Sequence, residues 1–501
     1  MAPSDSRSKW AGLLDLTLDR ASDQPLFQQV YLLLRGAIVA HALAPGTRLP
    51  STRGLAEHLG VSRTSVLSAY EQLLAEGYAV GHPRSGTYVS DDVPPAITPV
   101  EPMAGRLDEV PRRALSAAGA RYGAFGATIG PVADAAFATG CCSIDAATVE
   151  AWRRIGARAM RGLDPLNLSY ADPLGEPALR QEVAEYLRAS RAVVCDPDQI
   201  IIVSGAQQAI DLSIRALIDP GDAVWVEDPG YLATRSALTA AGARLVPVPV
   251  DEHGLRVGSG IAAAPTARAA YITPSHQYPT GAIMSMARRL DLLAWAAETG
   301  GWIIEDDYDS EFRYVGRPLA SLQGLDRSGS VIYVGTLSKV LFPGIRLGFA
   351  VVPKPLVDAF RGARFLTDRH PPALQQAMAA TFMHQGLLTS HIRRMRQHYR
   401  EARDVVVDAI GRHMGDLVDI EVPECGIQLV VHFKEPISDL AVAEAAARHG
   451  VTVRPVSPLY IDQPARQGLV LGYSGFDLHR LRSAAADLAR ATRSAAIRGL
   501  A

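Results

Sequence analysis

The sequence is poor in cysteine and lacks a long apolar run, and each shortage excludes a class of protein. Only four cysteines occur in 501 residues, too few for a disulfide framework, and none has the spacing of a metal site. No uninterrupted apolar stretch is long enough to span a bilayer. The first residues, MAPSDSRSKW, are polar and lack the apolar core of a signal peptide. We therefore expect a cytoplasmic protein with no metal site.

The sequence also has little net charge. The formal value is −2, so no global field attracts the chain to nucleic acid or membrane, and any DNA binding must come from a local surface. Hydrophobic residues make up 48% of the chain and charged residues 20%, which allows most of it to bury a core. The length fits one small and one large domain.

Two differently patterned regions are separated by a proline-rich stretch. Residues 20–91 read as short helices followed by a hairpin, and residues 121–501 alternate apolar strands with amphipathic helices. Residues 92–120 contain five prolines and no sustained periodicity, which is typical of a semi-extended tether. Residues 1–19 are predicted to form an N-terminal tail.

The first region has the pattern of a helix-turn-helix with a wing. Helical spacing predicts helices over 25–43, 51–60 and 62–77, with Ser51 or Thr52 and then Ser62 as caps. Residues 78–90 predict a hairpin around a Pro-Arg-Ser-Gly turn.

The start of the third predicted helix carries short donors and an arginine, which suit a helix N-terminus laid in a major groove. Phosphate contacts would come from the second helix and the wing. The competing interpretation is a small packing domain, since residues 19–92 hold six basic and seven acidic side chains. The candidate DNA contacts are Arg53, Ser62, Arg63, Thr64, Ser65, Arg84 and Gly86.

The large region predicts an α/β domain with a largely parallel sheet, because seven apolar strands alternate with helices. The strands are predicted at 199–205, 223–230, 243–250, 269–275, 301–308, 330–338 and 346–353. Ligands in such domains bind at the carboxyl ends of the strands.

Chemically active residues follow several of these strands. Lys339 comes after Gly335-Thr336-Leu337-Ser338, where a partly buried amine could act as a nucleophile. Arg346 could clamp a phosphate, and small residues at Ala206 open a helix whose amides could do the same. Each piece alone has an ordinary explanation, such as a surface lysine or a turn. Their convergence at one edge of the sheet favours a phosphorylated pyridine aldehyde as ligand.

The motifs also resemble known families. Residues 45–89, from PGTRLPSTRGLAEHLG to RSGTYV, resemble the winged helix-turn-helix of GntR-family regulators. The motifs SGAQQAI, EDPGY, TPSHQYPTG, EDDYDSEFRY and GTLSKVLFPGIRLGF resemble fold-type-I aminotransferases that bind pyridoxal 5′-phosphate. The combination is similar to the MocR/GabR-type regulators, which implies binding as a homodimer to paired DNA half-sites. It also implies a smaller C-terminal subdomain at about 371–501.

The resemblance implies a role for each pocket residue. Lys339 would form a Schiff base, the internal aldimine, with pyridoxal 5′-phosphate, and Asp306 rather than Asp307 would face the pyridine nitrogen. Tyr308 would bond the phenolic oxygen and Tyr231 would stack on the ring. We also predict that His276 binds the cofactor. The phosphate would be held by Ala206, Gln207, Thr336, Ser338 and Arg346.

Two departures from the enzymes favour a sensor. Tyr278 replaces the asparagine of an Asn-Pro-Thr-Gly motif, and Val470 stands where the enzymes place the arginine that binds the substrate carboxylate. Arg235 or Arg454 could substitute for that arginine. We therefore expect a transcription regulator that senses pyridoxal 5′-phosphate or an amine or amino acid, with at most weak or half-transaminase activity. The alternatives are a working transaminase with a DNA-binding module and a protein whose cofactor is only structural.

Overall fold

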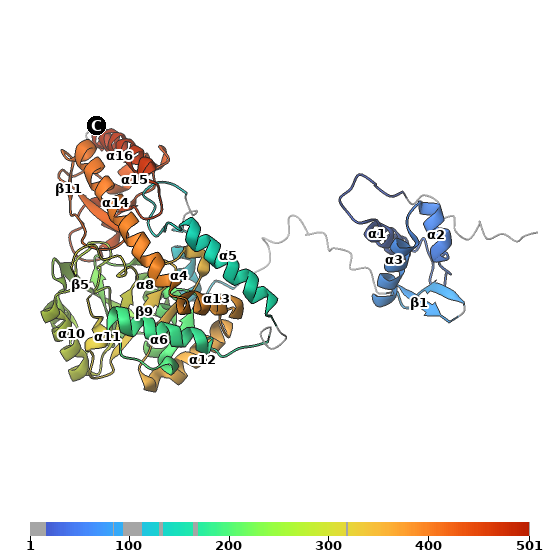
Figure 1. The fold of residues 1–501 in the computed structure, drawn as a ribbon, viewed down its shortest axis with the longest axis horizontal. Coiled ribbons are helices and arrows are strands. Elements are labelled where there is room, and N and C mark those ends of the chain that lie inside the picture. Colours follow the sequence, from blue (N-terminus) through green and yellow to red (C-terminus); the bar gives the residue numbers. More distant parts are fainter. Residues whose placement is uncertain are drawn as a thin grey trace, which may run out of the picture. The chain divides into compact units, whose positions relative to one another are not determined.

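The computed structural model describes residues 17–83, 85–93, 113–129, 134–163, 169–316 and 319–499. The chain divides into two compact units, 1–113 and 114–501 (Figure 1). This boundary falls within residues 92–120, the predicted linker. Most of that linker and of the predicted tail lies outside the described residues, so their bounds remain predictions.

The first unit is a small helical domain with a two-stranded wing. It contains α1 (Leu26–Val39), α2 (Thr52–Leu59), α3 (Arg63–Ala75), β1 (Ala79–His82) and β2 (Gly86–Val89). Ser51 and Ser62 cap α2 and α3, because their hydroxyls accept hydrogen bonds from the amides of Gly54 and Ser65. Gly60 ends α2 with φ 62°, a left-handed conformation that glycine adopts without strain.

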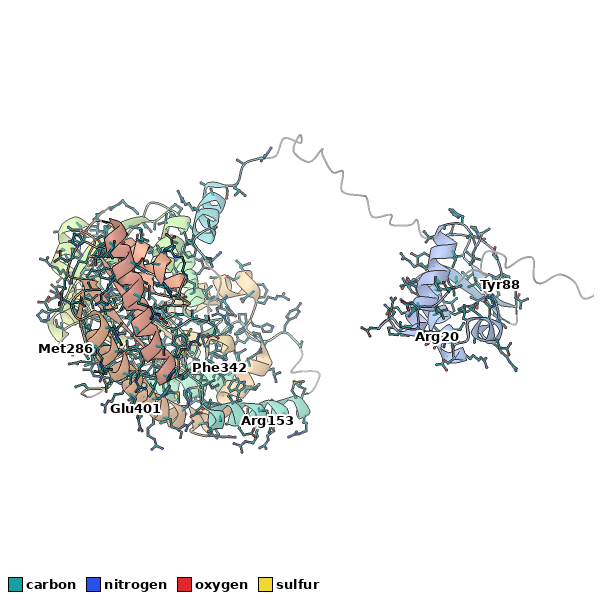
Figure 2. The ribbon with its side chains drawn as sticks, turned by 90° about the horizontal axis from the view of Figure 1, so that it is seen from above. Arg20, Tyr88, Arg153, Met286, Phe342 and Glu401 are labelled. Carbon is teal, nitrogen blue, oxygen red and sulfur yellow. The ribbon has the colours of Figure 1, made fainter. Side chains whose placement is uncertain are left out.

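The core of this unit joins all three helices to the wing. Leu34, Leu55, Leu73 and Val89 are buried together in one cluster. Arg20, labelled in Figure 2, donates a hydrogen bond of 2.7 Å to the carbonyl of Gly60 and so ties the segment before α1 to the end of α2. The elements that would meet DNA therefore sit on a packed scaffold.

The second unit is built on an eight-stranded sheet. In spatial order its strands are β3 (Ile200–Val203), β10 (Gly348–Val351), β9 (Val331–Thr336), β8 (Trp302–Asp307), β7 (Ala269–Ile272), β4 (Ala223–Asp228), β5 (Arg244–Asp251) and β6 (Gly254–Leu255). The β9–β8–β7–β4–β5 run is parallel, as the sequence predicts. β10 runs antiparallel to both β3 and β9, and β6 is antiparallel to β5.

Both faces of this sheet are covered by helices. Ile200 and Ile202 of β3 belong to one buried cluster, and Ile201 and Val203 belong to another on the opposite face. The helices of this unit are α4 (Ala117–Gly126), α5 (Ala146–Arg161), α6 (Pro177–Arg191), α7 (Ala206–Leu217), α8 (Leu232–Ala241), α9 (Val257–Ala263), α10 (Met286–Thr299), α11 (Leu322–Leu325), α12 (Val357–Asp368), α13 (Ala373–His384), α14 (Leu387–Met414), α15 (Asp439–Ala447) and α16 (Leu478–Gly499).

A second, antiparallel sheet forms a smaller body with α14, α15 and α16. Its order is β11 (Val418–Ile420), β12 (Gln428–Phe433), β14 (Gly468–Gly472) and β13 (Arg454–Pro455). Residues 136–138 join its core from earlier in the chain, and α14 contributes to this core and to that of the large sheet. Within the described ranges, no helix has the length and apolarity needed to cross a membrane.

Candidate functional site

A cavity of about 280 Å³ lies at the carboxyl edge of the large sheet, where it meets the small sheet. The structure brings together on its wall most of the residues that the sequence singles out. These are Ala206, Gln207, Tyr231, Asp306, Tyr308, Thr336, Ser338, Lys339, Arg346 and Arg454. The pocket also includes Thr139, Gly140, Tyr271, Tyr278 and Gln428, which the sequence does not mark as ligand contacts.

One end of the cavity has the features of an anion site. Helix α7 begins there behind Gly205, which has φ 112° and offers no side-chain cap to the first amides of the helix. The hydroxyl of Ser338 is buried, and no described residue forms a hydrogen bond with it. The φ of Gly205 favours glycine, and a Cβ there would lie 3.4 Å from both terminal nitrogens of Arg346, which shows how close the guanidinium is to the start of the helix. A phosphate fits these donors.

Arg346 reaches the cavity because of the direction of β10. That strand begins at Gly348 and runs antiparallel to β9, which ends at Thr336. The residues just before β10 therefore lie at the same edge as the residues just after β9. Thr336 also shapes this end, since its hydroxyl accepts a hydrogen bond of 3.1 Å from the amide of Ser338.

Lys339 extends along the cavity wall toward the small sheet. Its Nζ donates a hydrogen bond of 3.0 Å to the carbonyl of Gly140. A Cβ at Gly140, which has φ 82°, would lie 2.5 Å from Nζ, so glycine is required for this approach. Sequence reasoning missed Gly140, because it lies 199 residues before the lysine and no local pattern links the two.

Asp306 has the environment of a group that pairs with a buried cation. Its Oδ2 accepts a hydrogen bond of 2.6 Å from Tyr271, while Oδ1 is buried without a partner. Burial raises the pKa of Asp306 to about 7. Asp307 also has a buried Oδ1 without a partner among the described residues, but Arg191 and Tyr333 both donate to its Oδ2 and it does not line the cavity. Of the two carboxylates, only Asp306 is placed on the cavity wall, and its role toward a pyridine nitrogen stays a prediction.

Asp306→Asn should stabilise the cofactor-free protein at alkaline pH. The pKa of Asp306 is about 7 in the folded protein, against 3.8 for an ordinary aspartate. The folded state therefore binds the proton more tightly, and stability falls as pH rises from about 4 to about 7. Asparagine cannot ionise and can still accept from Tyr271, so the variant avoids a penalty of a few kcal/mol. Thermal melting of both proteins without cofactor should show the largest gain at pH 8. An equal difference at pH 5 and pH 8 would contradict this assignment.

Three tyrosines form the aromatic wall of the cavity. The rings of Tyr231 and Tyr278 meet edge to face at 5.7 Å, and those of Tyr278 and Tyr308 at 6.5 Å. His276 lies outside this cavity, with Nδ1 2.9 Å from an oxygen of Asp309 and 3.2 Å from the hydroxyl of Tyr308. Its place is behind Tyr308, where it can orient that hydroxyl but does not line the pocket.

The two arginines offered as carboxylate binders lie in different places. Arg235 donates a hydrogen bond of 2.8 Å to the carbonyl of Leu459 and does not line the cavity. Arg454 does line it. In the small sheet Arg454 is paired with Val470, and directly opposed residues of antiparallel strands have side chains on one face. Arg454 therefore stands one strand from the position where the enzymes have their arginine.

The predicted DNA contacts cluster at the start of α3. Ser62, Arg63 and Thr64 are exposed there, and Ser65 is half-buried with its hydroxyl 2.9 Å from that of Ser62. Nε of Arg63 donates a long hydrogen bond of 3.4 Å to Thr52, so its guanidinium is held only weakly. Arg53 is exposed on α2. These groups are accessible to a major groove.

Two further exposed residues lie at the wing: Gly86, which the sequence analysis predicts as a DNA contact, and Arg48, which it does not. Gly86 has φ 117°, and a Cβ on it would lie 3.1 Å from Nε of Arg48, which is itself exposed. Sequence reasoning did not single out Arg48, because only the bridge between Arg48 and Tyr88 brings it to the wing. Arg84 lies outside the described residues, so its predicted contact is untested.

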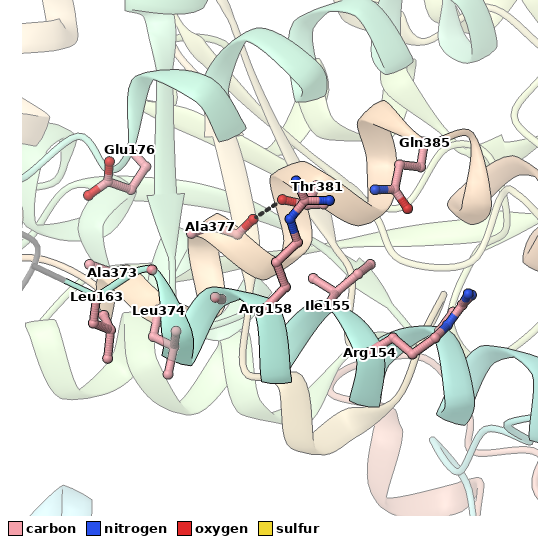
Figure 3. Close-up of a pocket in the computed structure, with 13 residues that line it drawn as sticks. Arg154, Ile155, Arg158, Leu163, Glu176, Ala373, Leu374, Ala377, Thr381 and Gln385 are labelled. Atoms are coloured by element: carbon pink, nitrogen blue, oxygen red, sulfur yellow. Dashed lines mark hydrogen bonds between the residues drawn. The ribbon is translucent and has the colours of Figure 1, made fainter.

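A larger hollow of about 650 Å³ lies between α5 and α13 (Figure 3). Arg154 and Arg158 of α5 line it, and Thr381 of α13 donates its hydroxyl to the carbonyl of Ala377. None of its described lining residues is a lysine, cysteine, histidine or aspartate. Its described lining therefore lacks a nucleophilic amine like that of Lys339.

Two protein families match this chain, one for each unit. The family described as bacterial regulatory proteins, gntR family, matches residues 26–89. The family described as aminotransferase class I and II matches residues 136–485.

Several curated proteins match almost the whole chain. The probable rhizopine catabolism regulatory protein MocR of Rhizobium meliloti is 41% identical over 93% of this chain and 94% of its own length. The pyridoxine biosynthesis transcriptional regulator PdxR of Corynebacterium glutamicum is 32% identical over 91% of this chain and 94% of its own.

Solved structures resemble the second unit. The α-aminoadipate aminotransferase LysN of Thermus thermophilus superposes with a TM-score of 0.67 at 27% identity, covering 72% of this chain and 93% of LysN. The kynurenine aminotransferase of Pyrococcus horikoshii gives a TM-score of 0.68 at 27% identity, covering 78% and 99%. The fold of the second unit is that of fold-type-I aminotransferases.

Proposed function

The chain belongs to the family of GntR-type transcriptional regulators with an aminotransferase-like domain, which includes MocR and PdxR, and from this we propose that it binds DNA in response to a ligand at Lys339. The ligand is pyridoxal 5′-phosphate itself or an amine that reacts at the cofactor. We propose the domain bounds given by the sequence: residues 20–91 bind DNA, and residues 121–501 bind the ligand.

The observation that carries the cofactor proposal is a set of polar groups without partners around one cavity. The Ser338 hydroxyl and Oδ1 of Asp306 lack hydrogen-bond partners among the described residues, and α7 begins without a side-chain cap. A phosphorylated pyridine aldehyde would satisfy each of them. Bound there, it would supply an electrophilic carbon that reacts reversibly with amines.

The chain's own residues would each perform a simple task. Lys339 supplies the nucleophilic amine, and Asp306 holds a proton at the pyridine nitrogen. Ala206, Gln207, Ser338 and Arg346 bind the phosphate. Tyr231 stacks on the ring and Tyr308 donates to the phenolic oxygen, with His276 acting through Tyr308.

The names of two relatives connect the family with the synthesis of a cofactor precursor and with a catabolic pathway. PdxR is named for pyridoxine biosynthesis and MocR for rhizopine catabolism. We propose that this chain forms a homodimer whose two winged domains bind paired half-sites. Ligand binding can shift that dimer only by the difference in affinity between its two states.

A second candidate is an active transaminase, because the structural neighbours include enzymes such as LysN. The small sheet argues against it, since Val470 is fully buried in a cluster with Tyr278, Val430 and Leu459 instead of presenting a cation. We expect turnover of common amino acids with keto acids to stay far below about 1 s⁻¹, the lower end of typical enzyme rates. Steady-state assays of the cofactor-loaded protein would measure this. Sustained turnover at ordinary enzyme rates would overturn the sensor-only interpretation.

A further inference from the structure

Gln428 is a buried residue whose amide nitrogen is unpaired in the described part of the chain. It is the first residue of β12 and only 5% exposed, and its Nε2 has no hydrogen-bond partner among the described residues. Gln428 lines the cavity that contains Lys339 and also a neighbouring hollow beside His276 and His432. An unpaired buried donor destabilises a fold, so such a group calls for an explanation.

Two other buried glutamines of this chain form hydrogen bonds with both their amide nitrogen and their amide oxygen. Gln376 donates to the carbonyl of Pro371 at 2.9 Å and accepts from the amide of Glu176 at 2.8 Å. Gln277 donates to Glu227 and to two carbonyls and accepts from Thr280. The fold thus satisfies glutamines that serve packing, which makes Gln428 an exception at the wall of the ligand cavity.

Arg454 faces the same cavity from the same side of the small sheet. Val470 is paired with Arg454 on one flank and with Val430 on the other, so all three share a face. Gln428 shares that face too, because it lies two residues from Val430 along β12. One strand, β14, lies between Arg454 and Gln428, so they are about 10 Å apart across the sheet and offset by two residues along it, a span that two long side chains can close around one small group.

The charges of the cavity leave this end positive. Asp306 is the one carboxylate among its described lining residues, and it lies at the cofactor end, bonded to Tyr271. Among the described residues, Arg454 forms no ion pair. Its guanidinium lies near the hydroxyl of Tyr278, a neutral group at physiological pH because burial raises its pKa. Because Arg454 is exposed and pairs with no described carboxylate, its guanidinium is available to an anionic group of a ligand in the cavity.

We propose that Gln428 and Arg454 together bind the acid group of the effector, which identifies the effector as a small amine that carries a carboxylate or similar anion. This inference rests on the proposed function, since the amine end must meet the cofactor at Lys339. A carboxylate has two oxygens, which can accept from the guanidinium and from the Gln428 amide at once. The cavity has a volume of about 280 Å³, which suits a small effector beside the cofactor.

The test uses matched ligands that differ only in the acid group. The full-length protein, loaded with pyridoxal 5′-phosphate, is titrated calorimetrically with alanine against ethylamine and with 4-aminobutyrate against butylamine. In at least one pair the acid should bind roughly 10–100-fold more tightly, as expected for hydrogen bonds to a charged group. The two pairs also distinguish an α-amino acid from an ω-amino acid.

Substitutions test whether Arg454 and Gln428 cause the preference for the acid over the matched amine. Arg454→Gln and Gln428→Met should each remove most of the preference for the acid, while Arg235→Gln, which changes an arginine outside the cavity, should keep it. Gln428→Met should melt no lower than the wild type, because it removes an unpaired buried donor; a packing role for Gln428 would instead lower the melting temperature.

The outcomes separate the two proposals. Equal binding of acids and matched amines, or a preference that survives both substitutions, would overturn this inference and leave the proposed function standing. If neither acids nor amines bind, amine sensing itself is wrong and this inference falls with it.

Discussion

Lys339→Ala is expected to abolish the near-visible absorbance band of the cofactor-loaded protein. The band of a lysine-bound pyridoxal requires the amine, and Lys339 is the one lysine among the described residues that line the cavity. The phosphate contacts at Ser338, Arg346 and α7 would remain, so the variant should still bind pyridoxal 5′-phosphate, but reversibly. Dialysis should then remove the cofactor from the variant and not from the wild type.

The matched control is Lys354→Ala. Lys354 is exposed and pairs with Asp196 at 2.6 Å, away from the cavity. This variant should keep the band and the cofactor through dialysis. A band of wild-type intensity in Lys339→Ala would mean that another group holds the cofactor.

The second large effect is expected in the winged domain. Arg63→Ala should weaken binding to the specific operator by about 1–3 kcal/mol per half-site, because a bidentate contact to a guanine is lost. A dimer on two half-sites would lose twice that free energy, more than a hundredfold in affinity at the middle of the range. Fluorescence anisotropy with operator DNA and with unrelated DNA would measure both losses.

Arg63→Lys separates charge from geometry. Lysine keeps the positive charge but not the planar fork, so this variant should retain binding to unrelated DNA while losing operator preference. Because the hydrogen bond from Arg63 to Thr52 is long, neither variant should change the melting temperature much. Operator binding unchanged in both variants would place the recognition surface elsewhere.

The sequence predicts the elements of this protein well, because their signals are local. The caps at Ser51 and Ser62, the glycine end of α2 and the seven predicted strands all depend on residues within a few positions of one another. The convergence of Asp306, Lys339 and Tyr231 also follows, since the carboxyl ends of parallel strands meet at one edge.

The remaining features depend on contacts between distant segments. The antiparallel course of β10 brings Arg346 to the site, and no local pattern gives that direction. The register of β13 and β14 places Arg454 in the cavity while Arg235 points elsewhere. In the sequence Gln428 resembles any other strand residue, and only the structure shows that its Nε2 has no hydrogen-bond partner among the described residues. Sequence identifies residue types at an edge, but only the packing of the small sheet shows which of them reach the ligand.

The same packing explains why the pocket suits a sensor. Under the proposal, the cofactor end keeps groups that could hold a phosphorylated pyridine, whereas at the other end Val470 is buried among apolar residues and a cation, Arg454, stands on the neighbouring strand. A ligand whose acid group is bound by Arg454 and Gln428 can be recognised without being converted to a product.

The most direct test is the affinity of the full-length protein for its operator, with and without pyridoxal 5′-phosphate and an acid-bearing amine. The operator can be selected from random DNA by the protein itself and the affinity measured by fluorescence anisotropy at fixed salt. We predict a change of about 5–150-fold when ligand is added, the range of typical coupling free energies, and no change on adding the amine to Lys339→Ala. Operator affinity that is the same in every ligand condition would contradict the account, because the aminotransferase-like domain would then have no influence on DNA.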